Sequence, residues 1–431
     1  METPDKIIQS CDPLDLLSKL SYLKWLMATD AFSDRDKQPF TFLEVKYALH
    51  YVMSYLLSHK LGEAANQSIQ YETISTLICA LAQEEINRKF NEEATLDKLS
   101  GKLQYTQKDS GELLPLFYSV PFHHILEGED DIISAKYGCN SNDILNDFVT
   151  LVGAFNNSVR AKGMKVFDFV NRFNDYCNSS ALAIQKNMKS YGLFKTMSGR
   201  IGQFAEDEFD HGYPISLIKK FRKLFIRVDD ILYCPDLELV PNLIVRCVER
   251  AMQQDKRQNP EWDLRMKKRT EKLVNGALSH YFKGGTYHAN SEFGQKEKGE
   301  SDGLFEFLGH LFIIEVKAGK LSPDPVESNN TTVHQSYKAT IGKGTKQCDK
   351  AEHHIIEHGG KFKEDGHEFR VNYDIEHIIK LVISFEDLSA VLPDENIQTP
   401  NHTILMTYFD LLIVLDYINE PILSLKYFLE R

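Results

Sequence analysis

The stretch from Gly299 to Gly319, GESDGLFEFLGHLFIIEVKAG, constrains the fold of this chain more than any other part of the sequence. Two mainly apolar runs, Leu304–Phe307 and Leu311–Val316, each with one glutamate, are separated by only three residues that include a glycine. Short apolar runs of this length that flank a glycine-containing turn are typical of a buried β-hairpin. We therefore expect an antiparallel pair of strands here, with charged residues at the ends of both strands.

The register of this hairpin decides where its charged side chains lie. A two-residue turn at Leu308–Gly309 places Asp302 opposite Glu315, whereas a turn at Gly309–His310 places Asp302 opposite Lys317. In both registers Asp302, Glu315 and Lys317 share one face of the sheet, because side chains alternate with a period of two. A three-residue turn would move Asp302 to the other face.

Two acids and a lysine beside so apolar a strand call for a physical explanation. Burial of a charged group without a partner costs several kcal/mol. A divalent cation removes this cost, because two carboxylates offer the hard oxygen ligands that Mg²⁺ prefers. A metal ion lowers the pKa of a bound water, and a nearby lysine can orient that water and neutralise charge on a phosphoryl group. The three residues are thus sufficient for hydrolysis of a phosphodiester bond.

A second Glu-Val-Lys triplet, Glu44–Lys46, serves as an internal control. Apolar and aromatic residues around it recur at helical spacing, and no hairpin precedes it. A helix would point Glu44 and Lys46 in different directions. We expect this copy to carry no chemistry, so the triplet is informative only in the context of the hairpin.

The chain divides into two regions of different pattern. Residues 13 to about 250 carry apolar side chains mainly at helical spacing, and the polar segment Gln253–Pro260 follows. We expect a mostly α-helical domain over residues 1–255 and an α/β domain with a mixed sheet flanked by helices over residues 256–431. The strands expected in the second domain are Tyr287–Phe293, Asp302–Phe307, Leu311–Lys317 and Lys380–Phe385, and its helices are Asp263–Phe282, Gly344–Glu357, Asp410–Ile418 and Pro421–Arg431.

The second domain resembles the PD-(D/E)xK nuclease superfamily, which has the restriction-endonuclease-like fold. The likeness lies in G-E-x-D, a short hairpin and a hydrophobic strand that ends in E-V-K, although Ser301 stands where the family motif often has proline. It implies that Asp302 and Glu315 bind a metal and that Lys317 is the catalytic lysine. It further implies a metal-supporting acid on the preceding helix, here Glu271, and a polar catalytic residue on the following helix, here Gln347. The resemblance covers residues 261 to 431.

These observations predict an Mg²⁺- or Mn²⁺-dependent endonuclease. By resemblance its substrate is DNA rather than RNA, and its setting is restriction or phage defence. The helical domain would bind a second copy of the chain, a partner protein or the substrate. The alternative is a catalytically inactive nuclease fold that binds nucleic acid or serves as a scaffold. Retention of a destabilising charged cluster argues against that alternative.

Charge and cysteine content limit the setting of the protein. A formal net charge of −12 excludes a protein that coats nucleic acid by bulk charge, although it leaves room for a local basic groove. The seven cysteines are scattered without a CxxC pair, and the N-terminus lacks the pattern of a signal peptide. The longest apolar stretch, Ile404–Ile418, contains two aspartates and is too short to span a bilayer. We expect a cytoplasmic protein without a membrane partner.

Overall fold

The computed structural model divides into two compact units, Met1–Asp255 and Lys256–Arg431. The residues that the structure describes are 2–28, 39–60, 69–91, 126–158, 165–171, 173, 179–211, 214–241, 243–244, 247–248, 251, 262–294, 299–317, 330–371, 377–385 and 403–430. None of the helices within these ranges combines the length and the hydropathy that a membrane span requires.

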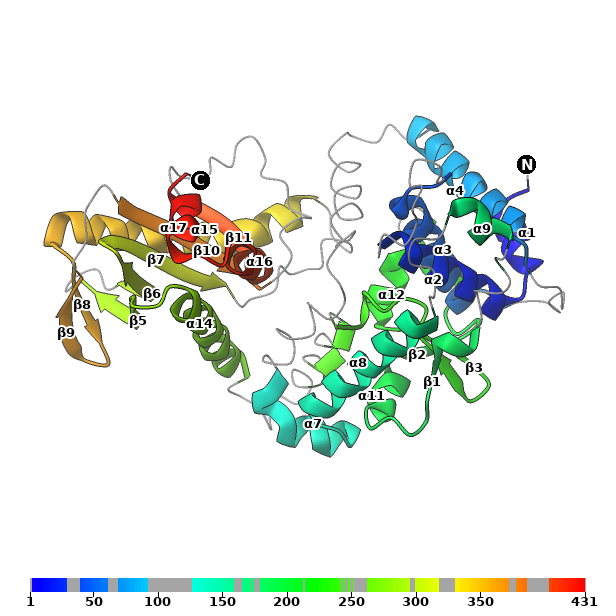
Figure 1. The fold of residues 1–431 in the computed structure, drawn as a ribbon, viewed down its shortest axis with the longest axis horizontal. Coiled ribbons are helices and arrows are strands. Elements are labelled where there is room, and N and C mark those ends of the chain that lie inside the picture. Colours follow the sequence, from blue (N-terminus) through cyan, green and yellow to red (C-terminus); the bar gives the residue numbers. More distant parts are fainter. Residues whose placement is uncertain are drawn as a thin grey trace. The chain divides into compact units, whose positions relative to one another are not determined.

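The N-terminal unit is mainly helical (Figure 1). Its helices include α1 (Pro4–Gln9), α2 (Pro13–Ala28), α3 (Phe42–Ser58), α4 (Tyr71–Asn91), α7 (Asp130–Tyr137), α8 (Ser141–Ser158), α9 (Val166–Asn171), α11 (Tyr191–Thr196) and α12 (Ile215–Phe221). A small sheet in the order β1-β4-β3-β2 also belongs to this unit, which the helical spacing of the sequence did not predict. Its strands are β1 (Ala183–Ile184), β2 (Ser198–Arg200), β3 (Phe225–Val228) and β4 (Ile231–Tyr233), too short to show a two-residue period.

The C-terminal unit is built on one mixed sheet in the order β11-β10-β7-β6-β5-β8-β9. Strand β10 runs parallel to both β7 and β11, whereas the pairs from β7 to β9 are antiparallel. The strands are β5 (Thr286–Phe293), β6 (Gly299–Phe307), β7 (His310–Lys317), β8 (Lys361–Glu364), β9 (His367–Arg370), β10 (Ile378–Ser384) and β11 (Thr403–Thr407). The prediction of an α/β domain with a mixed sheet is confirmed.

Helices cover both faces of this sheet (Figure 1). They are α14 (Trp262–Tyr281), α15 (Asn330–His358), α16 (Tyr408–Ile418) and α17 (Pro421–Leu429). Leu278 of α14, Leu411 of α16 and Phe428 of α17 pack with Phe312 and Ile314 into one core. A second core joins α15 to the other face, through side chains that include Leu304, Ile313, Cys348, Ala351 and Ile355.

The hairpin of β6 and β7 adopts the first of the two expected registers. Phe307 pairs with His310 and Gly303 with Ile314, so the turn consists of Leu308 and Gly309. Both turn residues have positive φ, 49° and 78°, as a tight two-residue hairpin turn of the primed type requires. This register directs Asp302 toward Glu315.

Candidate active site

The ladder between β6 and β7 ends at the predicted site. The last paired residues are Gly303 and Ile314, and beyond them the carboxylate of Asp302 accepts a hydrogen bond from the backbone N–H of Val316 at 2.9 Å. On the other side of β6, Asn290 of β5 has a φ of 45° and lies between the paired residues Ala289 and Ser291. Asparagine tolerates this left-handed conformation better than most residues. The sheet is therefore irregular around Asp302, whose side chain is buried.

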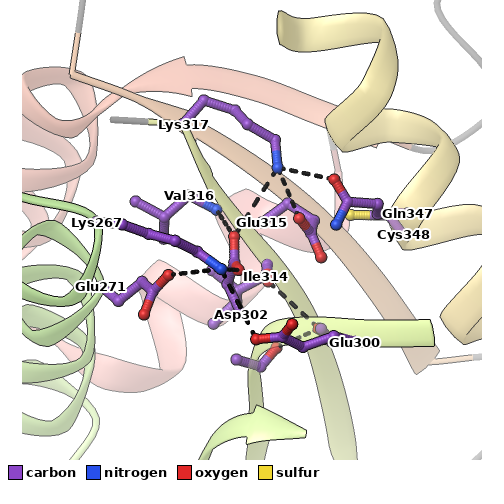
Figure 2. A network of polar contacts seen from close by, with 12 residues as sticks. Lys267, Glu271, Glu300, Asp302, Ile314, Glu315, Val316, Lys317, Gln347 and Cys348 are labelled. Carbon is purple, nitrogen blue, oxygen red and sulfur yellow. Dashed lines mark hydrogen bonds and ion pairs between the residues drawn. The ribbon is translucent and has the colours of Figure 1, made fainter. Parts of the chain in front are cut away.

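Glu315 and Lys317 converge with Asp302 at this point (Figure 2). Lys317 Nζ lies 2.7 Å from Glu315 Oε2 and 3.9 Å from Asp302 Oδ2. Burial, and after it the charge of Asp302, raise the pKa of Glu315 to about 8 against the lowering effect of Lys317. Among the described residues, none donates a hydrogen bond to Glu315 Oε1, although this atom is buried. The carboxylate thus retains a buried acceptor for a further ligand.

Helix α15 holds Lys317 in place. The side-chain oxygen of Gln347 accepts a hydrogen bond from Lys317 Nζ at 3.0 Å. One turn earlier, Gly344 leaves room for the lysine stem, because a Cβ at this position would lie 2.6 Å from Lys317 Cε. Lys380 of β10 fixes the helix on the sheet through ion pairs with Asp349 at 2.8 Å and Glu352 at 2.7 Å.

Helix α14 contributes Glu271 and Lys267, which lie one turn apart. Lys267 Nζ lies 3.4 Å from Glu271 Oε1, 3.3 Å from Asp302 Oδ1 and 3.7 Å from Glu300 Oε1 (Figure 2). Burial and the charge of Asp302 raise the pKa of Glu271 to about 7, against the lowering effect of Lys267. Partial burial acts to lower the pKa of Lys267, but the carboxylates of Asp302, Glu271 and Glu300 outweigh it and hold that pKa above its ordinary value.

The donor set of the site fits a hard cation in part. Asp302 and Glu315 offer carboxylate oxygens, and Glu315 Oε1 and Glu271 Oε1 are buried acceptors without a hydrogen-bond donor in the described part of the chain. Within the same ranges, however, no three His, Cys, Asp or Glu side chains form a ready-made group that could hold a metal ion. Asp302 and Glu315 are therefore the residues that would hold a metal, with Glu271 beyond the ammonium group of Lys267.

The structure brings all five predicted site residues into one network. Asp302, Glu315 and Lys317 meet on the hairpin, Gln347 contacts Lys317, and Lys267 forms ion pairs with both Glu271 and Asp302 (Figure 2).

Two positions were missed as parts of the site, Lys267 and Gly344. Lys267 precedes Glu271 by one helical turn, a spacing that could have revealed it. A glycine is needed at position 344 because the side chain of Lys317 passes close to it. The sequence of α15 by itself gives no sign of this contact.

In the control triplet, Glu44 and Lys46 lie on a helix and point in different directions, as predicted. Glu44 caps the start of α3, where its carboxylate accepts the backbone N–H of Thr41 at 2.7 Å. Lys46 turns elsewhere, with its Nζ 3.8 Å from Glu238 Oε2. The same Glu-Val-Lys sequence thus directs its two charged side chains apart on a helix and to one face on a strand.

In comparisons with known proteins, no family model, no curated protein and no solved structure matches the chain.

Proposed function

We propose that the C-terminal unit is a metal-dependent nuclease of the PD-(D/E)xK type that hydrolyses phosphodiester bonds. The observation that carries the proposal is the convergence of Asp302, Glu315 and Lys317 at the end of one buried hairpin. Two buried carboxylates and an ammonium group in contact form an energetically costly arrangement, and such clusters mark functional sites. The family resemblance favours Mg²⁺ or Mn²⁺ as the cofactor and DNA over RNA as the substrate.

Each side chain has a chemical task in this proposal. Asp302 and Glu315 would hold the metal, which supplies Lewis acidity and lowers the pKa of a bound water. Lys317, held by Gln347, presents its ammonium group beside both carboxylates, where it can orient a water and stabilise negative charge on a phosphoryl oxygen. Glu271 adds a further buried carboxylate next to Lys267.

Cleavage assays on the full chain test this function. Supercoiled plasmid and an RNA transcript are incubated with Mg²⁺, with Mn²⁺ or with a chelator, using wild type, Glu315→Gln and Lys317→Met. Asp365→Asn, in the exposed turn between β8 and β9, is the matched control. We expect metal-dependent cutting of DNA by wild type and control, reduced at least about 100-fold in both site variants. Equal traces of cutting in all four proteins would indicate a contaminant and contradict the proposal.

One observation favours a second candidate, a nuclease fold that binds nucleic acid without cutting it. The ammonium group of Lys267 lies between Glu271 and Asp302, and the described residues contain no ready-made three-ligand metal group. Such a protein would bind DNA in a mobility-shift assay equally well with metal and with chelator. DNA binding without cleavage under every metal condition would favour this candidate over the nuclease.

A further inference from the structure

Lys267 has an unusual number of acidic neighbours. Its Nζ lies between 3.3 and 3.7 Å from carboxylate oxygens of Asp302, Glu271 and Glu300. One ammonium group thus forms ion pairs with three carboxylates, one from α14 and two from β6. An ordinary surface ion pair joins one acid to one base and contributes little.

The charge balance of the network leaves a deficit of positive charge. With every group ionised, the carboxylates of Glu271, Glu300, Asp302 and Glu315 face the ammonium groups of Lys267 and Lys317 (Figure 2). Four negative charges against two positive charges leave a surplus of two, which is the charge of one divalent cation.

The two lysines are held differently. The Lys317 side chain is 13% exposed and makes hydrogen bonds to Glu315 and Gln347. The Lys267 side chain is 42% exposed, so it can swing away from Asp302 into solvent without opening the core. Its departure would leave Asp302 Oδ1 and the buried Glu271 Oε1 facing the same space.

We propose that Lys267 is a built-in counter-ion that neutralises Asp302 and Glu271 in the metal-free protein and is displaced when a divalent cation binds. This inference rests on the proposed function, because it takes the same carboxylates as metal ligands. A carboxylate oxygen that binds a metal lies about 2.0–2.6 Å from the ion. The ion would therefore overlap with an ammonium group that remained beside the same oxygen. The lysine and the metal therefore compete, and the lysine sets the cation concentration at which the site fills.

The test measures binding of Mn²⁺ to the full chain by electron paramagnetic resonance, without any substrate. The proteins compared are wild type, Lys267→Met, Asp302→Asn and the charge-matched control Lys268→Met, whose residue is exposed on the same helix. We expect Lys267→Met to bind Mn²⁺ at least about tenfold more tightly than wild type, because a competing charge close to the ligands is removed. Lys268→Met should stay within about twofold of wild type, because its charge is screened by solvent.

Thermal unfolding provides a second readout. Metal-free Lys267→Met should unfold at a lower temperature than wild type, because its carboxylates then repel one another, and Mn²⁺ should raise its unfolding temperature more than that of wild type. Should this variant fail to fold, Lys267→Gln, which keeps a hydrogen-bond donor, replaces it. The inference is overturned if the folded Lys267 variant binds Mn²⁺ no more tightly than Lys268→Met does.

The failures of the two proposals are distinguishable. One outcome is that wild type binds Mn²⁺, that Asp302→Asn abolishes the binding and that Lys267→Met leaves it unchanged. In that case the metal site stands, and only the role of Lys267 is wrong. If neither wild type nor Lys267→Met binds Mn²⁺, the metal-dependent nuclease and the counter-ion both fall.

Discussion

The carboxylate of Asp302 takes the place of a backbone carbonyl as the acceptor for the N–H of Val316, 2.9 Å away, where the paired ladder of β6 and β7 has ended. One oxygen of the side chain thereby completes the sheet, while the other faces Lys267. Asp302 therefore serves the fold and the site at once. The two roles can be separated by substitution, because only one of them needs a charge.

Asp302→Asn and Asp302→Ala should differ in stability while both lose activity. Asparagine retains an oxygen that can accept the N–H of Val316, whereas alanine leaves this buried donor unpaired, at a cost of about 1–3 kcal/mol. We expect cleavage to be lost in both variants, and Asp302→Ala to unfold more easily than Asp302→Asn by that amount. Denaturant-dependent hydrogen exchange, followed by mass spectrometry in peptides of Lys256–Arg431, measures the stability of the C-terminal unit. Equal stability of the two variants would contradict the structural role.

Gly344→Ala should reduce cleavage by displacing Lys317. A Cβ at this position would lie 2.6 Å from Lys317 Cε and 3.1 Å from Val382 Cγ1. The lysine stem is flexible and can move, so the change costs little stability, but its ammonium group leaves Glu315 and Gln347. We expect at least about a tenfold loss of the cleavage rate, because misplacement of a catalytic group by 1 Å can cost that much or more.

Gly342→Ala is the matched control on the same helix, since a Cβ there would meet no heavy atom of the described residues within 4 Å beyond its chain neighbours and its own helix backbone. It should retain full activity and gain about 0.5–1 kcal/mol of stability, the usual benefit of alanine over glycine in a helix interior. Similar cleavage rates in the two alanine variants would show that α15 does not position Lys317.

The hairpin and the elements around it could be predicted from the sequence because their signals are local. Apolar runs on both sides of Leu308–Gly309 predict β6 and β7, and the helical spacing after Trp262 predicts α14. The expectation that Asp302 and Glu315 share a face then follows from strand alternation together with a two-residue turn. Gln347 and Glu271 came from family resemblance, because nothing in the spacing of α14 or α15 indicates which turn faces the hairpin.

Elements without a strong local signal were missed. Strands β8 and β9 flank an Asp365–Gly366 turn but each carries a single phenylalanine. Strand β11 runs into α16 within one apolar stretch, where the periods of two and 3.6 cannot be separated. Helix α15 begins at Asn330, whereas the sequence predicted a start at Gly344. The first turns of this helix were not predicted because they contain β-branched residues of low helix propensity. The one-turn spacing of Lys267 from Glu271 is a local signal, but its contact with Asp302 depends on how α14 packs against the sheet.

Glu315→Gln should stabilise the metal-free protein while it abolishes cleavage. Burial raises the pKa of Glu315 to about 8, above its unfolded value, so this group favours the folded state at low pH and loses that contribution as the pH rises toward 8. A neutral isostere avoids the cost of the buried charge. At pH 8 with chelator present, we expect a gain of about 1–3 kcal/mol in the free energy of unfolding, measured by denaturant-dependent hydrogen exchange in peptides of the C-terminal unit. Unchanged or lower stability of the variant at pH 8 would show that Lys317 compensates the charge of Glu315 fully.

The N-terminal unit should lose stability as the pH falls from about 6.5 toward 4. His50 is buried with its Nε2 2.8 Å from Asp236 Oδ2, and Lys24 Nζ lies 2.7 Å from the other oxygen of the same aspartate. Burial lowers the pKa of His50 to about 4, although Asp236 acts to raise it. The unfolded chain therefore binds a proton at this histidine before the folded chain does, which favours unfolding by up to about 3 kcal/mol across this interval.

The measurement is denaturant unfolding between pH 7.5 and pH 4.5, followed by the fluorescence of Trp25 in a Trp262→Phe background. His50→Gln keeps a hydrogen-bond donor toward Asp236 but does not titrate, so its stability should change less over this interval than that of wild type. His288→Gln, in the C-terminal unit, controls for the loss of one histidine and should leave the response of Trp25 unchanged. A wild-type pH profile identical to that of His50→Gln would contradict the prediction, because the acid loss would then come from carboxylates, which protonate in the unfolded chain mostly below pH 5.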